Sequence, residues 1–348
     1  MQKLILALIA IGFASAAAAK DGNQTNHNQS FTGINTVIIS DFTGRLEVEI
    51  ADGDVGAALM GGEVPFPFSM SQEGDAVTLA GRERPRNYNI HDHLHWRKFH
   101  ENAFEEFLND YPTLRVRVPA GTALTLDNAI AIVNIGDLNG QLIVNRGFLQ
   151  GDIGDMADAD ISVYGSEDIS LGAVRDHLKA KLGGSGNFTA ASAGSAYLAL
   201  GGSGDMEIGA IAGDADLKIS GSGDIAAADI RGAMSARVSG SGDIKTGDVG
   251  KGGAFKISGS GDIDTQSVNG SVTAQISGSG DISIGDGRAE NLEVRIQGSG
   301  DFEFDGVSTN LDASVHGSGS VNVAKNTGSL RTSGRGEFRI GGITIEND

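Results

Sequence analysis

Over much of the chain apolar and polar residues alternate, and the alternating pattern itself repeats with a period of 19 residues. Each repeat carries Gly-Ser-Gly-Asp followed by an apolar residue. The aspartates of the six clear repeats are Asp205, Asp224, Asp243, Asp262, Asp281 and Asp301, with spacings of 19, 19, 19, 19 and 20 residues. Weaker copies place Asp168 and Asn187 before this series and Ser320 after it.

Alignment on the aspartate shows which positions face inward. The residue after it is apolar in each clear repeat, as at Ile225 and Ile244, and so is the residue five places before it, as at Ile219 and Val238. Alternation with a period of two is typical of a strand with one buried face. Each repeat is therefore predicted to hold two or three short strands.

Glycine corners such as residues 221–223 are expected to join these strands, because glycine accepts positive φ and lets backbones approach closely. One repeat buries about four apolar side chains, too few to offset the entropy of ordering it, so repeats must stack. The sequence predicts an all-β fold, a parallel β-helix with coils of about 19 residues. The crossover rule for parallel strands favours the right-handed form.

The start of the chain has the pattern of an export signal. Residues 1–19 combine Lys3, an apolar stretch and a run of alanines, which predicts a signal peptide removed on export. No later apolar stretch reaches the ~20 residues of a membrane span. We therefore expect an exported protein without a transmembrane segment after signal removal, in the periplasm or at the cell surface or outside the cell.

Pattern changes divide the rest of the chain. Residues 20–30 are polar and are expected to be a disordered linker. Residues 31–85 have irregular strand patterns and are expected to form atypical coils that cap the rod. Residues 86–110 are expected to form an amphipathic helical insert, and residues 111–345 the β-helix of 19-residue repeats.

Charge and composition exclude several classes of function. The formal net charge is -19, from 26 Lys+Arg and 45 Asp+Glu. Nucleic acid is therefore not expected as a partner, because phosphate binding needs clustered cations. The chain has no cysteine, which excludes disulfides, thiolate metal sites and a cysteine nucleophile.

The aspartate column is the first candidate site. Corner chemistry, with each aspartate bonding its own backbone beside the glycines, is the structural interpretation. Binding of Ca²⁺ between coils is the functional alternative for Asp205, Asp224, Asp243, Asp262, Asp281 and Asp301. In the insert, His91 and His95 would share one helix face and could bind Zn²⁺ or Cu²⁺. The sequence requires no cofactor beyond these candidate cations.

A basic column forms the second candidate site. Lys218, Arg237, Lys256 and Arg295 occupy one outward position of successive repeats, interrupted by Gln275. A solvated face that balances the acidic column is one interpretation, and a face for acidic glycans is the other. Glycans or envelope proteins are the expected partners.

Catalysis finds little support in the repeats. A catalytic site needs groups with distinct roles and environments, whereas the aspartates recur once per coil in the same setting. The serines of the repeat have no histidine nearby, so a hydrolytic triad is not indicated. We expect a non-enzymatic protein, with a polysaccharide-active enzyme on a β-helix or a metal-binding envelope protein as alternatives.

The signal peptide, the atypical β start and the repeated Ser-Gly-Ser-Gly-Asp-Ile together resemble a bacterial family called putative auto-transporter adhesin, head GIN domain. The resemblance covers roughly residues 33–340, is headed by Gly33-Ile34-Asn35 and is densest at 220–225, 239–244, 258–263 and 277–282. It implies a right-handed single-stranded β-helix, an envelope or surface setting and a role as adhesin or scaffold, and it supplies no catalytic residues.

The sequence departs from the family's pattern in its histidine-rich insert and in its end. The last residues, 341–345, resemble another coil and not the strands of a membrane barrel. Self-transport to the surface is therefore not expected, and the periplasm is at least as well supported.

Overall fold

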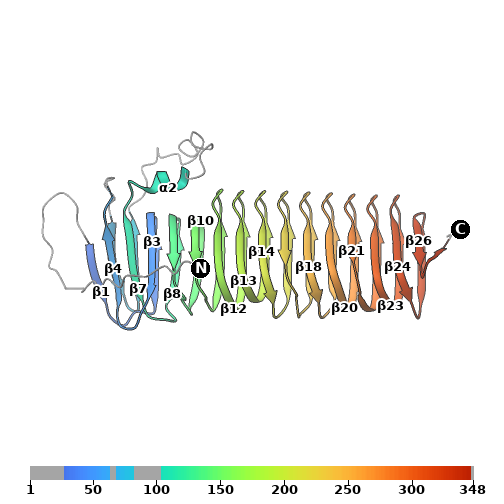
Figure 1. The fold of residues 1–348 in the computed structure, drawn as a ribbon, viewed down its shortest axis with the longest axis horizontal. Coiled ribbons are helices and arrows are strands. Elements are labelled where there is room, and N and C mark those ends of the chain that lie inside the picture. The colour runs from blue at the N-terminus through green and yellow to red at the C-terminus, as the bar shows by residue number, and fades with distance from the viewer. Residues whose placement is uncertain (1–26, 63–67, 82–102, 346–348) are drawn as a thin grey trace, which may run out of the picture.

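The computed structural model describes residues 27–62, 68–81 and 103–345, and these form a straight rod of stacked β coils (Figure 1). The rod is a β-solenoid of about 11 turns with coils of about 19 residues. At ~4.8 Å between paired strands its length is roughly 50 Å. The all-β solenoid predicted from the repeats is confirmed.

The strand register separates two faces of the rod. The first face holds the strands that follow the Gly-Ser-Gly-Asp corner, and the second holds the strands that precede it. From the N-terminal end, the first face contains β1 (His27–Phe31), β4 (Val55–Met60), β7 (Thr113–Val118), β3 (Thr43–Ile50), β9 (Ile130–Ile135), β14 (Met206–Ile211), β16 (Ile225–Ala227), β18 (Ile244–Val249), β21 (Ile282–Ile284), β24 (Ser320–Asn326), β26 (Glu337–Ile340) and β27 (Ile343–Ile345).

The second face has the same parallel stacking over most of its length. It contains β5 (Phe68–Glu73), β6 (Ala76–Gly81), β2 (Thr36–Ser40), β8 (Ala123–Asp127), β11 (Asp158–Val163), β15 (Ala215–Ile219), β17 (Met234–Val238), β19 (Gly253–Ile257) and β25 (Leu330–Gly334). Six longer strands run through a corner between the faces: β10 (Gln141–Ile153), β12 (Ile169–Leu182), β13 (Phe188–Leu200), β20 (Ile263–Ile276), β22 (Gly287–Ile296) and β23 (Phe302–Val315).

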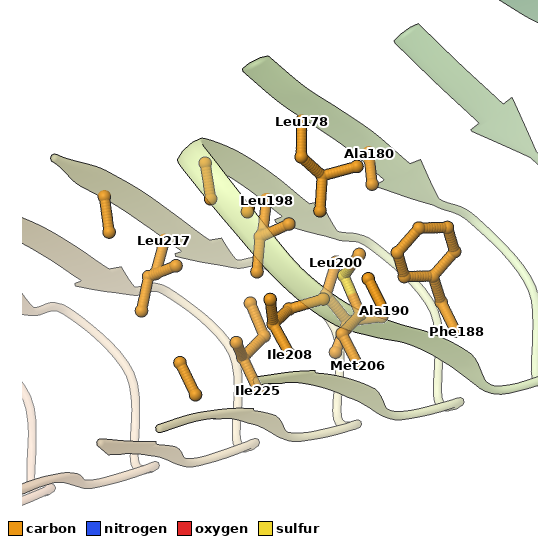
Figure 2. Close-up of a cluster of buried hydrophobic side chains, with 14 of the residues drawn as sticks. Leu178, Ala180, Phe188, Ala190, Leu198, Leu200, Met206, Ile208, Leu217 and Ile225 are labelled. Carbon is orange, nitrogen blue, oxygen red and sulfur yellow. The ribbon is translucent and has the colours of Figure 1, made fainter. Parts of the chain in front are cut away.

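Apolar side chains from the two faces meet inside the rod. Figure 2 shows Leu198 and Leu217 of the second face opposite Ile208 and Ile225 of the first. Equivalent residues stack in register, so that Ile225 pairs with Ile244 in the next coil. The aliphatic columns read from the sequence are therefore the core, with each coil covering the open edge of the one before.

The N-terminal end of the rod does not follow chain order. On the second face β2 lies between β6 and β8, and on the first face β3 lies between β7 and β9. The coil formed by β6 and β7 therefore lies outside the coil formed by β2 and β3. Antiparallel strands β4 and β5 are added beyond it, which ends the parallel stack.

Residues 27–30 correct one expectation. The polar segment 20–30 was expected to be disordered, but its last four residues belong to β1, which pairs antiparallel with β4. An edge strand needs backbone pairing more than apolar side chains, and Phe31 at its end is buried.

At the C-terminal end of the rod β26 and β27 form an antiparallel hairpin, where another parallel coil was expected.

One short helix lies on the outside of the rod near its N-terminal end. Helix α2 (Ala103–Leu108) buries Phe104 and Leu108 against Ile130. Glu105 of the helix accepts a hydrogen bond from Arg45 at 3.1 Å. This confirms a helix within the insert, while most of the predicted helical segment, with His91 and His95, lies outside the described residues.

The corner glycines are required by close stacking. A Cβ on Gly240 would lie 1.8 Å from the carbonyl oxygen of Gly221 in the preceding coil, and the equivalent glycines 259, 278 and 298 meet the same clash. None of these glycines has a positive φ. Of the two reasons expected for glycine here, close approach of backbones is therefore correct, and positive φ does not apply at this corner.

The substitution Gly240→Ala should lower the free energy of unfolding by about 1–3 kcal/mol, because backbone atoms of the preceding coil must shift. Gly201→Ser is the matched control. A Cβ on Gly201 would meet nothing closer than 3.8 Å, and serine already occupies the paired position 220. Urea unfolding followed by circular dichroism measures both variants, and equal losses of stability would contradict this account of the corner.

Candidate ligand-binding face

The aspartate column forms a ladder of hydrogen bonds between coils. The Oδ1 atom of Asp224 accepts the backbone N–H of Asp243 at 2.8 Å, and Asp243 in turn accepts the N–H of Asp262 at 2.9 Å. The same bond joins Asp205 to Asp224, Asp262 to Asp281, and Asp281 to Asp301. Each carboxylate therefore holds the next coil through a charge-assisted hydrogen bond.

The hydrogen-bond partner of the aspartate carboxylate differs from the one expected from the sequence. The aspartate was expected to bond its own backbone, but its acceptor oxygen reaches the following coil instead. The backbone carbonyl of each aspartate is already occupied, since Asp243 accepts the N–H of Ile225 through it. The amide N–H of the same residue points to the preceding coil, where the carboxylate is the group that accepts it.

Substitutions within the chain agree with this role. Asn187 occupies the same position one coil earlier and accepts the N–H of Asp205 at 3.1 Å. At the other end, Ser320 donates both its backbone N–H and its hydroxyl to Asp301. An uncharged acceptor therefore fits the ladder as well as a carboxylate does.

The variant Asp243→Ala should cost about 1–3 kcal/mol of unfolding free energy, because the half-buried N–H of Asp262 loses its acceptor. Asp243→Asn keeps an acceptor at the same place and should stay close to the parent. Thermal and urea unfolding of the two variants check this. If asparagine destabilises the protein as much as alanine, the ladder is not held by acceptor geometry.

No three His, Cys, Asp or Glu side chains come together as a metal site within the part of the chain that the structure describes. Binding of Ca²⁺ by the aspartate column stays a prediction. The candidates His91 and His95 lie outside the described residues, so the Zn²⁺ or Cu²⁺ interpretation is also a prediction.

The basic column lies on the second face of the rod. Strand register places Lys218 beside Arg237 and Arg237 beside Lys256, followed by Gln275 and Arg295. All of these side chains alternate with buried residues and so point outward. The four cations read from the sequence are brought into one line, as their spacing predicts.

One further cation belongs to this line and was missed in the sequence. Lys181 pairs with Ala199, which pairs with Lys218, so Lys181 lies two coils before Lys218 in the same column. The weaker repeat around Asn187 hides this relation. Extension of the alignment by one more copy would have revealed it.

Two members of the column have acidic neighbours. Lys218 donates to Asp216 at 2.6 Å and lies 4.5 Å from the ring centre of Tyr197. The hydrogen bond with Asp216 raises the pKa of Lys218 above its usual value. Arg295 lies 2.9 Å from Glu293 and 3.8 Å from Asp312.

The other three cations have no such neighbour. Among the described residues, Lys181, Arg237 and Lys256 form no ion pair. The chain holds 45 acidic residues against 26 Lys+Arg, so three unpaired cations within one column are not a consequence of composition. They leave positive charge open to a ligand on this face.

Two shallow hollows lie on the same face. The larger, of about 770 Å³, runs over β13, β15, β17 and β19, where its lining includes Tyr197, Asp216 and Lys251. The smaller, of about 400 Å³, lies along the basic column and is lined by Lys181, Lys218 and Arg237. Both are open grooves, which suit an extended ligand better than a compact one.

The first face carries a separate electrostatic feature beside the aspartate ladder. Partial burial raises the pKa of Asp264, and the carboxylates of Asp262, Asp243 and Asp281 add to the rise, while Lys245 opposes it. Burial also raises the pKa of Glu167, with a smaller contribution from Asp168. Ionised Asp264 is therefore less favourable in the folded chain than in the unfolded one.

The substitution Asp264→Asn should make the protein more stable than the parent at neutral pH, because it removes a carboxylate whose ionisation folding disfavours. The gain should shrink as the pH falls and the folded carboxyl group takes up a proton. It should vanish below the ordinary Asp pKa of 3.8, where both states are protonated. Unfolding measured from pH 3 to 8 tests this, and a gain that grows toward acid pH would contradict it.

Comparison with models of known protein families identifies one family that matches this chain. The family described as putative auto-transporter adhesin, head GIN domain, matches residues 109–251 and 233–327. Comparison with the curated proteins finds no match. Among the described residues no helix is long and apolar enough to cross a membrane.

Two crystal structures are similar to this chain at low identity. A putative lipid binding protein from Parabacteroides distasonis is 16% identical, with a TM-score of 0.31, and the match covers 86% of this chain and 97% of that one. A putative adhesin from Bacteroides fragilis is 13% identical, with a TM-score of 0.27, and the match covers 84% of this chain and 98% of that one.

Proposed function

The chain belongs to the putative auto-transporter adhesin, head GIN domain family, and on this basis we propose that it is a non-enzymatic protein of the cell envelope that binds extended polymers along its faces. The repetition of outward side chains from coil to coil carries the proposal. In the basic column Lys218, Arg237 and Lys256 follow one another at ~4.8 Å steps in successive coils. A polymer with repeating units can contact such a column at several points at once.

Repeated weak contacts produce useful affinity. A single exposed charge pair contributes little, about 0.2–1 kcal/mol. When several such contacts lie on one rigid rod and one ligand chain, each contact after the first forms within a tethered complex. The stiffness of the solenoid favours this, because the coils are fixed relative to one another by the corner ladder.

The arrangement of the titratable groups supports a non-enzymatic role. The aspartates of the ladder recur once per coil, and each accepts the same backbone hydrogen bond from the next coil. Catalysis by carboxylates requires two or more groups with contrasting environments at one place. The alternative of a polysaccharide-active enzyme has no comparable support among these residues.

The start of the sequence and the family support an exported location. Residues 1–19 have the pattern of a signal peptide, and the family's description is that of an adhesin. We place the protein in the periplasm or at the cell surface. Cell fractionation combined with protease shaving of intact cells distinguishes these two locations.

Retention on insoluble envelope polymers of the producing cells tests the proposed function. The full mature chain should be retained at low salt and released as salt rises, because exposed charge contacts are screened. The protein should bind the intact polymers more strongly than it binds their short fragments. Absence of retention on every envelope fraction at low salt, or equal binding of fragments and polymers, would overturn the proposal.

A further inference from the structure

The smaller hollow of the second face has the composition of a site for an acidic sugar chain. We propose that the groove from Tyr164 to Arg237 binds a stretch of acidic polysaccharide, with the carboxylate or sulfate groups on Lys181, Lys218 and Arg237. This inference rests on the proposed function and names the class of polymer and the coils that recognise it.

A small residue creates the hollow. In the basic column Ala199 stands between Lys181 and Lys218, one coil from each. Its short side chain opens a groove of about 400 Å³, and Arg237 continues the line one coil beyond Lys218. Cations thus flank the hollow on both sides along the rod axis, while its floor is a small apolar residue.

Tyr164 forms the end wall of the groove. A Cβ on Gly183 would lie 2.5 Å from a ring carbon of Tyr164, so the ring rests on the backbone of the next coil. The Tyr164 side chain nevertheless stays 46% exposed and is one of three large apolar side chains exposed in the described part of the chain. A flat aromatic ring with one free face beside cations provides a surface for a sugar ring.

The cations repel one another when no ligand is bound. Lys218, Arg237 and Lys256 follow in successive coils, and neighbouring unit charges at ~4.8 Å repel by roughly 0.9 kcal/mol in water. Asp216 compensates Lys218, but no ion pair compensates Arg237 or Lys256 among the described residues. An anionic ligand would remove this repulsion as well as form its own contacts.

Carboxylates lie on both sides of the cation row, and this favours a chain over a surface. The neighbouring column on the second face includes Asp160, Lys179 and Asp216, and in it Lys179 donates to Asp160 at 2.8 Å. Beyond the corner lies the aspartate ladder. An anionic membrane laid on this face would meet both sets of carboxylates. A linear polyanion can follow the cations between them. The hydroxyls of Ser220 and Ser239 line the same groove and suit the hydroxyl groups of a sugar.

Binding of polygalacturonate, dextran sulfate, neutral dextran and phosphatidylglycerol vesicles to the full mature chain tests the inference. The parent should bind at least one of the two acidic polysaccharides and not neutral dextran. The double variant Lys181→Gln with Arg237→Gln should weaken that binding about tenfold, since two charge contacts are lost. Ala199→Glu should weaken it to a similar extent by filling the hollow with a carboxylate.

The matched control carries Lys245→Gln and Arg331→Gln, two exposed cations outside the groove with the same change in net charge. It should bind within about twofold of the parent if only long-range attraction is altered. Tyr164→Ala separates ring contact from charge and should weaken polysaccharide binding without changing its salt dependence. Thermal unfolding midpoints equal to the parent's show that the variants are folded.

Several outcomes would overturn the inference. These are no binding of either acidic polysaccharide by the parent, equal losses in the groove and control variants, or binding of vesicles in preference to polysaccharides. Retention on envelope polymers that survives the groove substitutions would leave the proposed function standing and remove only this site. If the parent protein is not retained on any envelope polymer, the proposed function itself is wrong.

Discussion

The hydrogen bond from one coil's corner to the next is the interaction on which the structure depends. At each Gly-Ser-Gly-Asp corner a glycine carbonyl accepts the serine N–H of the following coil, as Gly221 does from Ser241 at 3.0 Å. The aspartate carboxylate accepts the next aspartate N–H beside it. Both bonds need the backbones to approach so closely that a Cβ at the glycine would overlap a carbonyl oxygen. Glycine and aspartate therefore recur together because one permits the contact that the other completes.

This corner also determines what the outer faces can do. Because every coil is held at the same spacing, outward side chains at the same position of successive repeats form straight columns. A charged residue at one repeat position therefore produces a row of like charges. The second face carries a row of cations, and the corner at the edge of this face carries a row of carboxylates. A surface of this kind suits extended and repetitive ligands. The groove that we propose for an acidic polysaccharide lies where the repeat is broken, at Ala199 and Tyr164.

The repeat made most of the rod predictable from sequence. The inward columns, the two-faced coil and the line formed by Lys218, Arg237, Lys256 and Arg295 all depend on spacing alone. The arrangement of the capping coils could not be predicted. The coil of β6 and β7 comes later in the chain than β2 and β3 but lies closer to the end of the rod, and pairing between strands distant in sequence leaves no local pattern. The partner of the aspartate carboxylate could not be read either, since a bond within the corner and a bond to the next coil require the same residue. Lys181 could have been found by extending the alignment to the weak repeat around Asn187, whereas the hollow at Ala199 required the structure.

Amide hydrogen exchange at the corner tests the central claim most directly. The N–H groups of Asp224, Asp243, Asp262 and Asp281 lie in loops at the edge of the rod, yet each donates to a carboxylate of the preceding coil. The account predicts that these amides exchange as slowly as those of the adjoining strands and open together with them. Exchange at the rate of an unprotected loop, while the strands remain protected, would show that the corner ladder does not hold the coils together.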